Sequence, residues 1–252
     1  MTLNEIRTNG LLPMLIAGES HEISIWSIVV FCIIAGAAAY FLGSLNFAVI
    51  ISKYKFHEDI RTYGSGNGGM TNMLRTYGKA AAGMTLLGDA AKAAVSVFIG
   101  TMLAGEAGAF IAGLCCVVGH SFPIYYGFRG GKGIVVTATT LLCLEPLTFL
   151  ILFIIFVILV ASTKFLSLGS IIGMLLYPLL LNRIYPFTHG GVSEGAVAAI
   201  CSLLNAVLVI WLHRENIKRL MEGKENKFSL KKKDKFKKDE KAEEAPAEEE
   251  SK

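Results

Sequence analysis

Residues 147–162, LTFLILFIIFVILVAS, contain no charged side chain, and only Thr148 and Ser162 carry a hydroxyl group. About 20 apolar residues cross the hydrocarbon core of a membrane as a helix, and fewer are enough where neighbouring helices shield the ends. This stretch therefore predicts a membrane-spanning helix. The whole chain agrees, because 53% of its 252 residues are hydrophobic and only 17% are charged, a composition outside that of ordinary soluble domains.

Six other apolar runs have the composition of membrane helices. They cover residues 25–52, 80–103, 107–126, 134–144, 166–181 and 195–212, and the run over 134–144 is the shortest. Together with residues 147–162 they predict an all-α integral membrane protein of about seven transmembrane helices.

Basic residues are divided unevenly between the two sides of such a bundle. Of the 24 Lys and Arg residues, 21 fall on one side, Arg7 and Arg183 fall on the other, and Lys92 lies inside a run. Cytoplasmic loops are enriched in Lys and Arg, so we expect the C-terminus in the cytoplasm and the N-terminus outside. The expected divisions are an extracytoplasmic extension (1–24), a transmembrane domain (25–225) and a charged, disordered cytoplasmic tail (226–252).

The cysteines point to packing rather than to chemistry. All five lie inside apolar runs, without the spacing of a zinc site or a disulfide framework. The sequence indicates no cofactor, and it neither requires nor excludes a metal. It gives no support for a nucleic-acid partner, because the basic excess lies at the membrane face.

A first polar segment, residues 64–75, reads GSGNGGMTNMLR. Glycines permit close approach of the backbone to a ligand, and hydroxyl, amide and guanidinium groups can surround an anion. A flexible loop with hydroxyl caps is the alternative, and Arg75 favours the anion site. The candidate binding residues before Arg75 are Gly64, Ser65, Gly66, Asn67, Thr71 and Asn72.

A second polar segment, residues 128–133, reads FRGGKG at the start of an apolar run. Lys132 is expected beside backbone amides, near the positive end of the following helix, which favours a phosphate. The alternative is a basic anchor at the membrane surface. An anchor needs no glycine, whereas Gly130, Gly131 and Gly133 surround this lysine.

A third polar segment, residues 213–225, reads HRENIKRLMEGKE directly after the last apolar run. His213 and Asn216 are three residues apart, so they share a face if the helix continues. A basic helix lying on anionic lipid also fits, through Arg214, Lys218 and Arg219. We expect both, with different residues serving each purpose.

Three further side chains are unusual for their position in apolar runs. Asp89 and Lys92 are costly at membrane depth unless they are paired or face a polar cavity. We interpret them as a structural ion pair that supports the site, in preference to direct substrate contact. His120 is expected either to orient the Lys132 loop or to be a packed histidine.

These segments, in this order, resemble the acyl-phosphate:glycerol-3-phosphate acyltransferases, the PlsY family. The resemblance covers most of the chain. It includes LGS at 42–44, DIRTYGSGN at 59–67, TNMLR at 71–75, GHSFP at 119–123, FRGGKG at 128–133 and HRENIKRL at 213–220.

The resemblance implies a bacterial plasma-membrane enzyme with its active site at the cytoplasmic face. Such an enzyme moves a fatty acyl group from acyl phosphate, not from acyl-CoA or acyl carrier protein, to the 1-hydroxyl of glycerol 3-phosphate. The product is lysophosphatidic acid, in the first committed step of phospholipid synthesis. The implied partners are glycerol 3-phosphate, acyl phosphate and membrane lipid, and the enzyme that makes the acyl phosphate is a further candidate.

The family pattern also implies roles for individual residues. Ser65 and Arg75 take the important positions of the first motif, and the glycines around Lys132 bind the glycerol phosphate with it. The third motif supplies His213, Asn216 and a structurally needed Glu225. The chain departs from the pattern at Leu45, Asn46 and Met70, and Met70 is expected to narrow the site or alter acyl-chain preference.

Acyl phosphates are activated mixed anhydrides, so positioning and charge stabilisation are the expected means of catalysis. We expect direct attack of the glycerol hydroxyl, with the proton passing to the departing phosphate in preference to His213. No carboxylate is spaced to orient His213, and Ser65 has no neighbouring base in sequence. The competing class is a membrane transporter for an organic phosphate, which would place polar residues along several helices on both sides.

Overall fold

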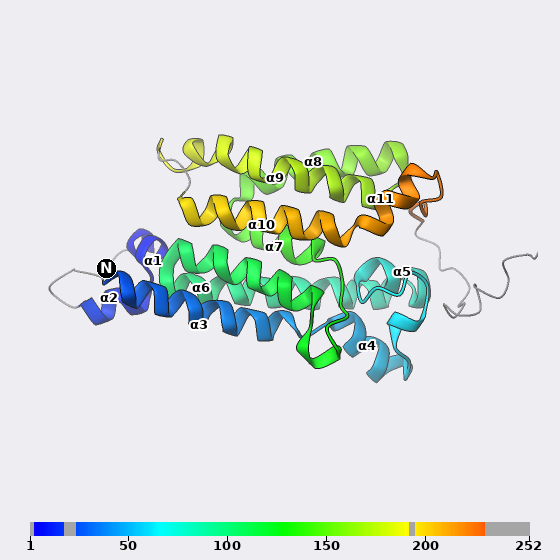
Figure 1. The fold of residues 1–252 in the computed structure, drawn as a ribbon, viewed down its shortest axis with the longest axis horizontal. Coiled ribbons are helices and arrows are strands. Elements are labelled where there is room, and N and C mark those ends of the chain that lie inside the picture. The colour runs from blue at the N-terminus through cyan, green and yellow to red at the C-terminus, as the bar shows by residue number, and fades with distance from the viewer. Residues whose placement is uncertain (1–2, 18–23, 192–194, 230–252) are drawn as a thin grey trace, which may run out of the picture.

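The computed structural model describes residues 3–17, 24–191 and 195–229, and within these ranges the chain is helical and forms no sheet. This confirms the expected all-α class. The helices lie side by side along one long axis (Figure 1). They are α1 Leu3–Asn9, α2 Leu11–Ala17, α3 Ile25–Gly43, α4 Phe47–Phe56, α5 Met70–Tyr77, α6 Lys79–Ser121, α7 Ile134–Leu144, α8 Pro146–Thr163, α9 Leu166–Thr188, α10 Ala196–Leu212 and α11 Arg214–Met221.

The long helix α6 folds back on itself. Ala104 and Gly105 have non-helical backbone angles, with φ of −148° and +61°. The two arms then pack so closely that a Cβ atom added to Gly100 would lie 2.4 Å from the carbonyl oxygen of Gly108. The arms correspond to the predicted helices over 80–103 and 107–126, although the second arm ends at Ser121 and residues 124–126 form a 3-10 turn.

The helix predicted over residues 25–52 is interrupted between α3 and α4, although Ile25–Phe56 together still have the length and composition of one membrane span. The Asn46 side chain caps α4 by accepting a hydrogen bond of 3.1 Å from the Val49 backbone N–H. The break frees the carbonyl groups of Gly43 and Leu45, and Lys92 Nζ donates to both at 2.9 Å. A buried lysine therefore satisfies the backbone groups that the broken helix leaves open.

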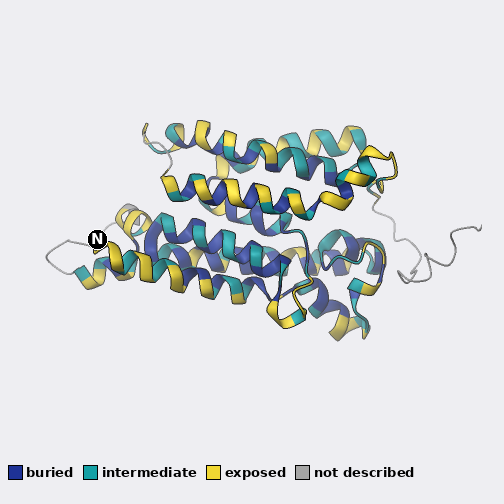
Figure 2. Cartoon of the chain, viewed as in Figure 1, coloured by how far each residue is buried: buried dark blue, intermediate teal, exposed yellow. Residues whose placement is uncertain are grey.

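Small residues bring α3 against the second arm of α6. A Cβ atom at Gly43 would lie 2.3 Å from the Cys116 carbonyl oxygen, and one at Gly119 would lie 2.2 Å from the Tyr40 carbonyl oxygen. Interfaces of this kind are typical of helices in membranes, where close backbone approach drives association. Burial is concentrated on α6 and α7, while α3, α8 and α9 carry exposed outer faces (Figure 2).

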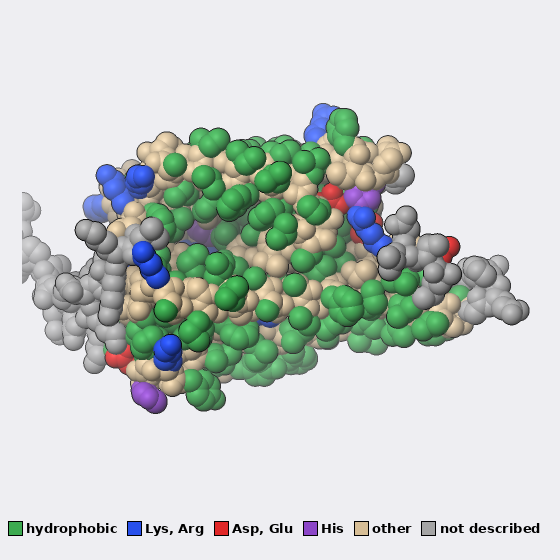
Figure 3. All heavy atoms as spheres, turned by 180° about the vertical axis from the view of Figure 1, so that it is seen from behind, with side chains coloured by type: hydrophobic (Ala, Val, Ile, Leu, Met, Phe, Trp, Pro, Cys, Tyr) green, Lys and Arg blue, Asp and Glu red, His purple; other side chains and the backbone are tan. Residues whose placement is uncertain are grey.

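The outer surface is apolar over the middle of the molecule. In the view from behind, hydrophobic side chains cover the centre and charged side chains gather toward the two ends (Figure 3). Within the described residues, four helical stretches have the length and composition to cross a membrane, or five if α10 and α11 count as one bent span. Helix α7 has 11 residues, which is about 16 Å of helix, and it cannot cross the hydrocarbon core alone.

The N-terminal extension is helical where it is described. Helices α1 and α2 lie at the end of the bundle where α6 reverses (Figure 1). A Cβ atom at Gly10 would lie 2.8 Å from the backbone nitrogen of Gly105, so this segment packs directly on the turn. The predicted disorder of the tail falls mostly on residues 230–252, which lie outside the described ranges.

Candidate active site

The three polar segments meet at one end of the bundle, where α5 and α11 lie (Figure 1). The first and second segments are joined by a hydrogen bond of 3.1 Å from the Gly68 backbone N–H to the Gly130 carbonyl oxygen. The second and third segments are joined because Lys132 Nζ donates to Asn216 Oδ1. Residues about 150 positions apart in the sequence thus form one polar surface.

Asn72 organises the first segment. Its Nδ2 donates to the carbonyl oxygens of Ile60, Tyr63 and Asn67 at 3.0–3.1 Å, and its Oδ1 accepts from the Ser65 N–H at 3.1 Å. The side chain is buried and bonds to the loop backbone with both of its polar atoms. In this structure Asn72 holds the loop that presents Ser65.

The other first-segment residues lie nearer the surface. Gly64 and Ser65 are exposed, while Gly66, Asn67 and Thr71 are half-buried. Asn67 Nδ2 lies 3.3 Å from Ser65 Oγ. The Ser65 hydroxyl is thus available to a ligand from the solvent side.

The glycines of the second segment pack against His120. The Gly130 N–H donates to the Ser121 carbonyl and the Gly131 N–H donates to the His120 carbonyl, both at 3.1 Å. A Cβ atom at Gly130 would lie 2.0 Å from the His120 carbonyl oxygen, and one at Gly131 would lie 2.2 Å from His120 Nε2. Close packing of the loop is therefore sufficient to explain both glycines.

Asp89, Lys92 and His120 form a buried cluster beneath this loop. Lys92 Nζ lies 2.8 Å from Asp89 Oδ1 and 3.0 Å from His120 Nδ1. The predicted ion pair is confirmed, and none of the three residues is more than 4% exposed. The cluster joins the two arms of α6. The backbone carbonyl group of His120 also accepts a hydrogen bond from the loop that contains Lys132.

Glu225 organises the third segment. The chain bends by 56° between α10 and α11, at His213. Glu225 Oε1 then accepts from Asn216 Nδ2 at 2.8 Å and from Ser167 Oγ at 3.0 Å, while Glu225 Oε2 accepts from Arg219 Nε at 2.8 Å. This carboxylate fixes the asparagine that Lys132 contacts.

Positive charge is concentrated where the segments meet. The pKa of Lys132 falls to about 8, mainly through burial, with Arg219 and Arg75 also lowering it and Glu225 opposing them. Burial also lowers the pKa of Arg75. The pKa of His213 falls to about 4, through burial and the charge of Lys132. An anion bound here would relieve the repulsion between these cations.

Sequence reasoning missed three residues of this region. The sequence identifies Arg219 only as a lipid-surface residue, yet it forms an ion pair with Glu225 and lies close enough to Lys132 to lower its pKa. Arg61 joins the loops by donating to the carbonyl oxygens of Tyr126 and Arg129 at 2.5 and 2.9 Å. Asn46 is fully buried and donates to the Gly68 carbonyl at 3.0 Å. A buried asparagine in an apolar run was the signal available for the last of these.

An apolar groove of about 410 Å³ runs from these segments along the bundle. Met70 of the first segment and Ile134, two residues after Lys132, line it together with side chains of α7, α8 and α9. These include Leu141, Leu142, Phe149, Phe153, Met174 and Tyr177. The lining of the groove is almost entirely hydrophobic.

Known proteins match about four-fifths of this chain. A family described as glycerol-3-phosphate acyltransferase matches residues 33–223. A glycerol-3-phosphate acyltransferase of Thermoanaerobacter sp. (strain X514) is 40% identical over 201 residues, which are 80% of this chain and 98% of that protein. One from Neisseria meningitidis serogroup C (strain 053442) is 41% identical over 204 residues, which are 79% of this chain and 98% of that protein.

A solved structure has the same fold. It is the crystal structure of PlsY (YgiH), an integral membrane glycerol 3-phosphate acyltransferase, in its glycerol 3-phosphate form. It aligns with a TM-score of 0.70 and 30% identity, over 79% of this chain and 96% of that one. The lysophosphatidic acid form of the same protein aligns with a TM-score of 0.67.

Proposed function

The chain belongs to the glycerol-3-phosphate acyltransferase family, and from this premise we propose that it forms lysophosphatidic acid by transferring a fatty acyl group from acyl phosphate to the 1-hydroxyl of glycerol 3-phosphate. The observation that carries the proposal is that the cationic cluster of Arg75, Lys132 and Arg219 lies beside the apolar groove. Lys132 lies in the cluster, and Met70 and Ile134 line the groove beside it. Glycerol 3-phosphate and acyl phosphate together need both features. Their head groups are anionic and would bind the cations, and the alkyl chain of the donor would lie in the groove.

Arg75 and Lys132 are the proposed head-group ligands. Arg75 offers several N–H donors in a planar fork, and Lys132 offers a compact ammonium group. Both are partly buried, so their attraction for phosphate is screened less than on an open surface. Ser65, on the exposed face of the first loop, is proposed as a further hydrogen-bond donor to phosphate.

The proposed reaction is a direct transfer. The glycerol hydroxyl oxygen forms a bond to the acyl carbon, the bond from that carbon to the phosphate oxygen breaks, and the proton passes to the departing phosphate. The low pKa of His213, about 4, makes its imidazole a weak base and supports this assignment of the proton. His213→Ala should reduce the rate without abolishing it, and complete loss with intact substrate binding would overturn the assignment.

The groove is the proposed site of the acyl chain. Its lining includes Met70, where the chain departs from the family pattern. Replacement of Met70 by Ala should widen the groove near the reacting carbon. We propose that this residue adjusts which acyl chains are accepted.

The proposed topology has seven spans, with the N-terminus outside and the active site at the cytoplasmic face of a bacterial plasma membrane. The segregation of 21 Lys and Arg residues to the side of the site supports it. Helix α7 is then a short span inside the bundle, where neighbouring helices cover its ends. A fluorescent protein fused after residue 252 should fluoresce, because the fusion would fold in the cytoplasm; an active alkaline phosphatase fusion there would reverse the orientation.

The decisive experiment uses the purified full chain in detergent with radiolabelled glycerol 3-phosphate. Palmitoyl phosphate and palmitoyl-CoA are supplied in parallel, and labelled lysophosphatidic acid is measured. The proposal expects product with palmitoyl phosphate alone, and loss of product in Arg75→Ala and Lys132→Ala. Product from palmitoyl-CoA would contradict the proposed donor, and ping-pong kinetics would contradict direct transfer. No product from either donor, with folded protein, would revive the transporter hypothesis.

A further inference from the structure

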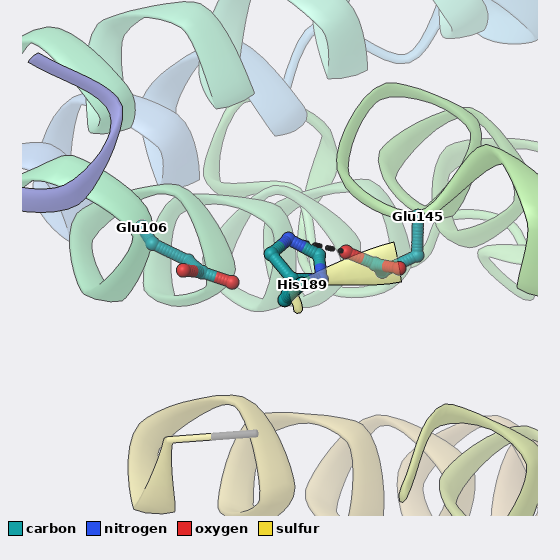
Figure 4. A group of neighbouring side chains, drawn as sticks. All are labelled: Glu106, Glu145 and His189. Atoms are coloured by element: carbon teal, nitrogen blue, oxygen red, sulfur yellow. Dashed lines mark ion pairs between the residues drawn. The ribbon is translucent and has the colours of Figure 1, made fainter. Parts of the chain in front are cut away.

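A second polar cluster lies at the opposite end of the bundle, where α6 reverses. It consists of Glu106 at the α6 turn, Glu145 between α7 and α8, and His189 after α9 (Figure 4). The imidazole lies between the two carboxyl groups, and the possible ligand atoms of the three side chains lie within 4.8 Å of one another. The acyl-transfer proposal uses none of these residues.

Neighbouring groups orient all three side chains. His189 Nδ1 lies 2.8 Å from Thr188 Oγ1 and 3.1 Å from the Tyr185 carbonyl oxygen, which favours a proton on Nδ1 and leaves the lone pair on Nε2, the nitrogen that Arg7 contacts. Tyr185 Oη donates to Glu106 Oε1 at 2.5 Å, and Thr188 Oγ1 donates to Glu145 Oε2 at 3.1 Å. An imidazole that donates one ring nitrogen to a carbonyl and turns the other toward carboxylates is the arrangement found around metal-binding histidines.

One carboxylate oxygen of the cluster lacks a donor. Glu145 is 1% exposed, and its Oε1 atom has no hydrogen-bond partner in the described part of the chain. This oxygen faces His189 Nε2 at a distance of 3.4 Å. A buried carboxylate oxygen without a donor is unfavourable unless a cation lies beside it.

Arg7 of α1 places a positive charge at this point. Its guanidinium group lies 3.7 Å from Glu145 Oε1 and contacts His189 Nε2. The Arg7 side chain is half exposed, so it is able to leave. Against two carboxylates it supplies a single positive charge, whereas a divalent ion supplies two.

We propose that Glu106, Glu145 and His189 form a binding site for a divalent transition-metal ion, with Zn²⁺ as the best match, and that Arg7 competes with the ion for this site. Two carboxylates and one imidazole suit Zn²⁺ and leave a fourth position for water. Bonds to Zn²⁺ of about 2.0–2.2 Å require the ligand atoms to move together by roughly 1–1.5 Å, which rotation of the two glutamate side chains can supply. Metal binding and docking of α1 through Arg7 exclude each other.

Isothermal titration of the purified full chain with ZnCl₂ tests the proposal. We expect one saturable site per chain. Glu145→Gln and His189→Ala should each weaken binding by about tenfold or more, while Arg7→Ala should tighten it. The opposite response of the arginine variant distinguishes a competing cation from a structural neighbour.

Two control variants address other possible ligands. His57 is an exposed histidine in the loop after α4, and Cys143 is an exposed thiol two residues before Glu145. His57→Ala and Cys143→Ser should leave the affinity unchanged. Loss of binding in Cys143→Ser but not in His189→Ala would overturn the proposed ligands.

Folding is checked by acyl transfer, because the cluster lies at the far end of the bundle from the three polar segments. If one ligand variant does not fold, Glu106→Gln provides the same test. Absence of saturable Zn²⁺ binding in both the unaltered chain and Arg7→Ala would overturn the proposal. Unchanged affinity in Glu145→Gln and Glu106→Gln would do the same.

Discussion

The lowered pKa of Lys132 gives the sharpest prediction about catalysis. A fall of its pKa from 10.5 to about 8 corresponds to about 3 kcal/mol against the charged form in the free protein. Only the charged form attracts phosphate. Because kcat/KM reports ionisations of the free enzyme, it should be full below pH 8 and lost as the pH rises through about 8.

The size of the effect follows from the same value. At pH 9 about a tenth of the Lys132 side chains with a pKa of about 8 keep their proton, so kcat/KM should fall about tenfold from its plateau. An unshifted lysine would lose almost nothing at that pH. Glycerol 3-phosphate stays a dianion across this range because its second pKa is about 6. Bound phosphate favours the ammonium form, so the corresponding limb of kcat should lie at higher pH.

The assay is initial-rate lysophosphatidic acid formation between pH 6.5 and about 10, corrected for spontaneous hydrolysis of the acyl phosphate. In Lys132→Arg the side chain keeps its charge at these pH values, so the alkaline limb should disappear from whatever activity remains. Lys79→Arg, at an exposed position, is the matched control and should keep the limb. A limb near pH 10, or an unchanged limb in Lys132→Arg, would refute the reasoning.

Further predictions concern the residues that hold the site together. Gly131→Ala should sharply reduce activity, because the added Cβ atom would lie 2.2 Å from Nε2 of the buried His120. Gly69→Ala, where a Cβ atom would have nothing within 4 Å, should be tolerated. Equal rates of acyl transfer in the two variants would contradict this. Glu225→Gln should raise the KM for glycerol 3-phosphate and lower stability by about 1–3 kcal/mol, while Glu222→Gln, on an exposed ion pair, should change neither in denaturation and rate measurements. Asp89→Asn should destabilise the fold by about 3–5 kcal/mol, because it leaves a buried lysine without its countercharge, and a melting temperature within a degree or two of the parent would oppose that view.

Much of the fold could be predicted from the sequence because long apolar runs have few alternatives. The break between α3 and α4 could not, since the apolar run continues through Leu45 and Phe47 and only Ser44 and Asn46 interrupt it. That asparagine caps a helix and binds the first polar loop at once. Its role depends on a residue 22 positions away, which local sequence patterns do not reveal.

The site shows the same division between chemistry and packing. The convergence of Arg75, Lys132 and Asn216 could be predicted because their segments follow helices on the same expected side. The structural role of the glycines beside Lys132 could not be predicted. A sequence shows that a Cβ atom is absent, but it does not show which atoms pack against that position. At Gly131 the neighbour is His120. A glycine at position 131 is therefore expected both if the loop binds an anion and if the loop packs tightly against His120.

The central claim is that the cationic cluster binds the phosphate of glycerol 3-phosphate. Equilibrium titration of the purified chain with glycerol 3-phosphate, in the absence of donor, tests it most directly. Hydrogen bonds to charged groups contribute about 1.5–3 kcal/mol each, so Lys132→Met and Arg75→Met should each weaken binding by about 10- to 150-fold, while Lys79→Met binds as the parent does. Unchanged affinity in both cluster variants, with the fold intact, would contradict the account.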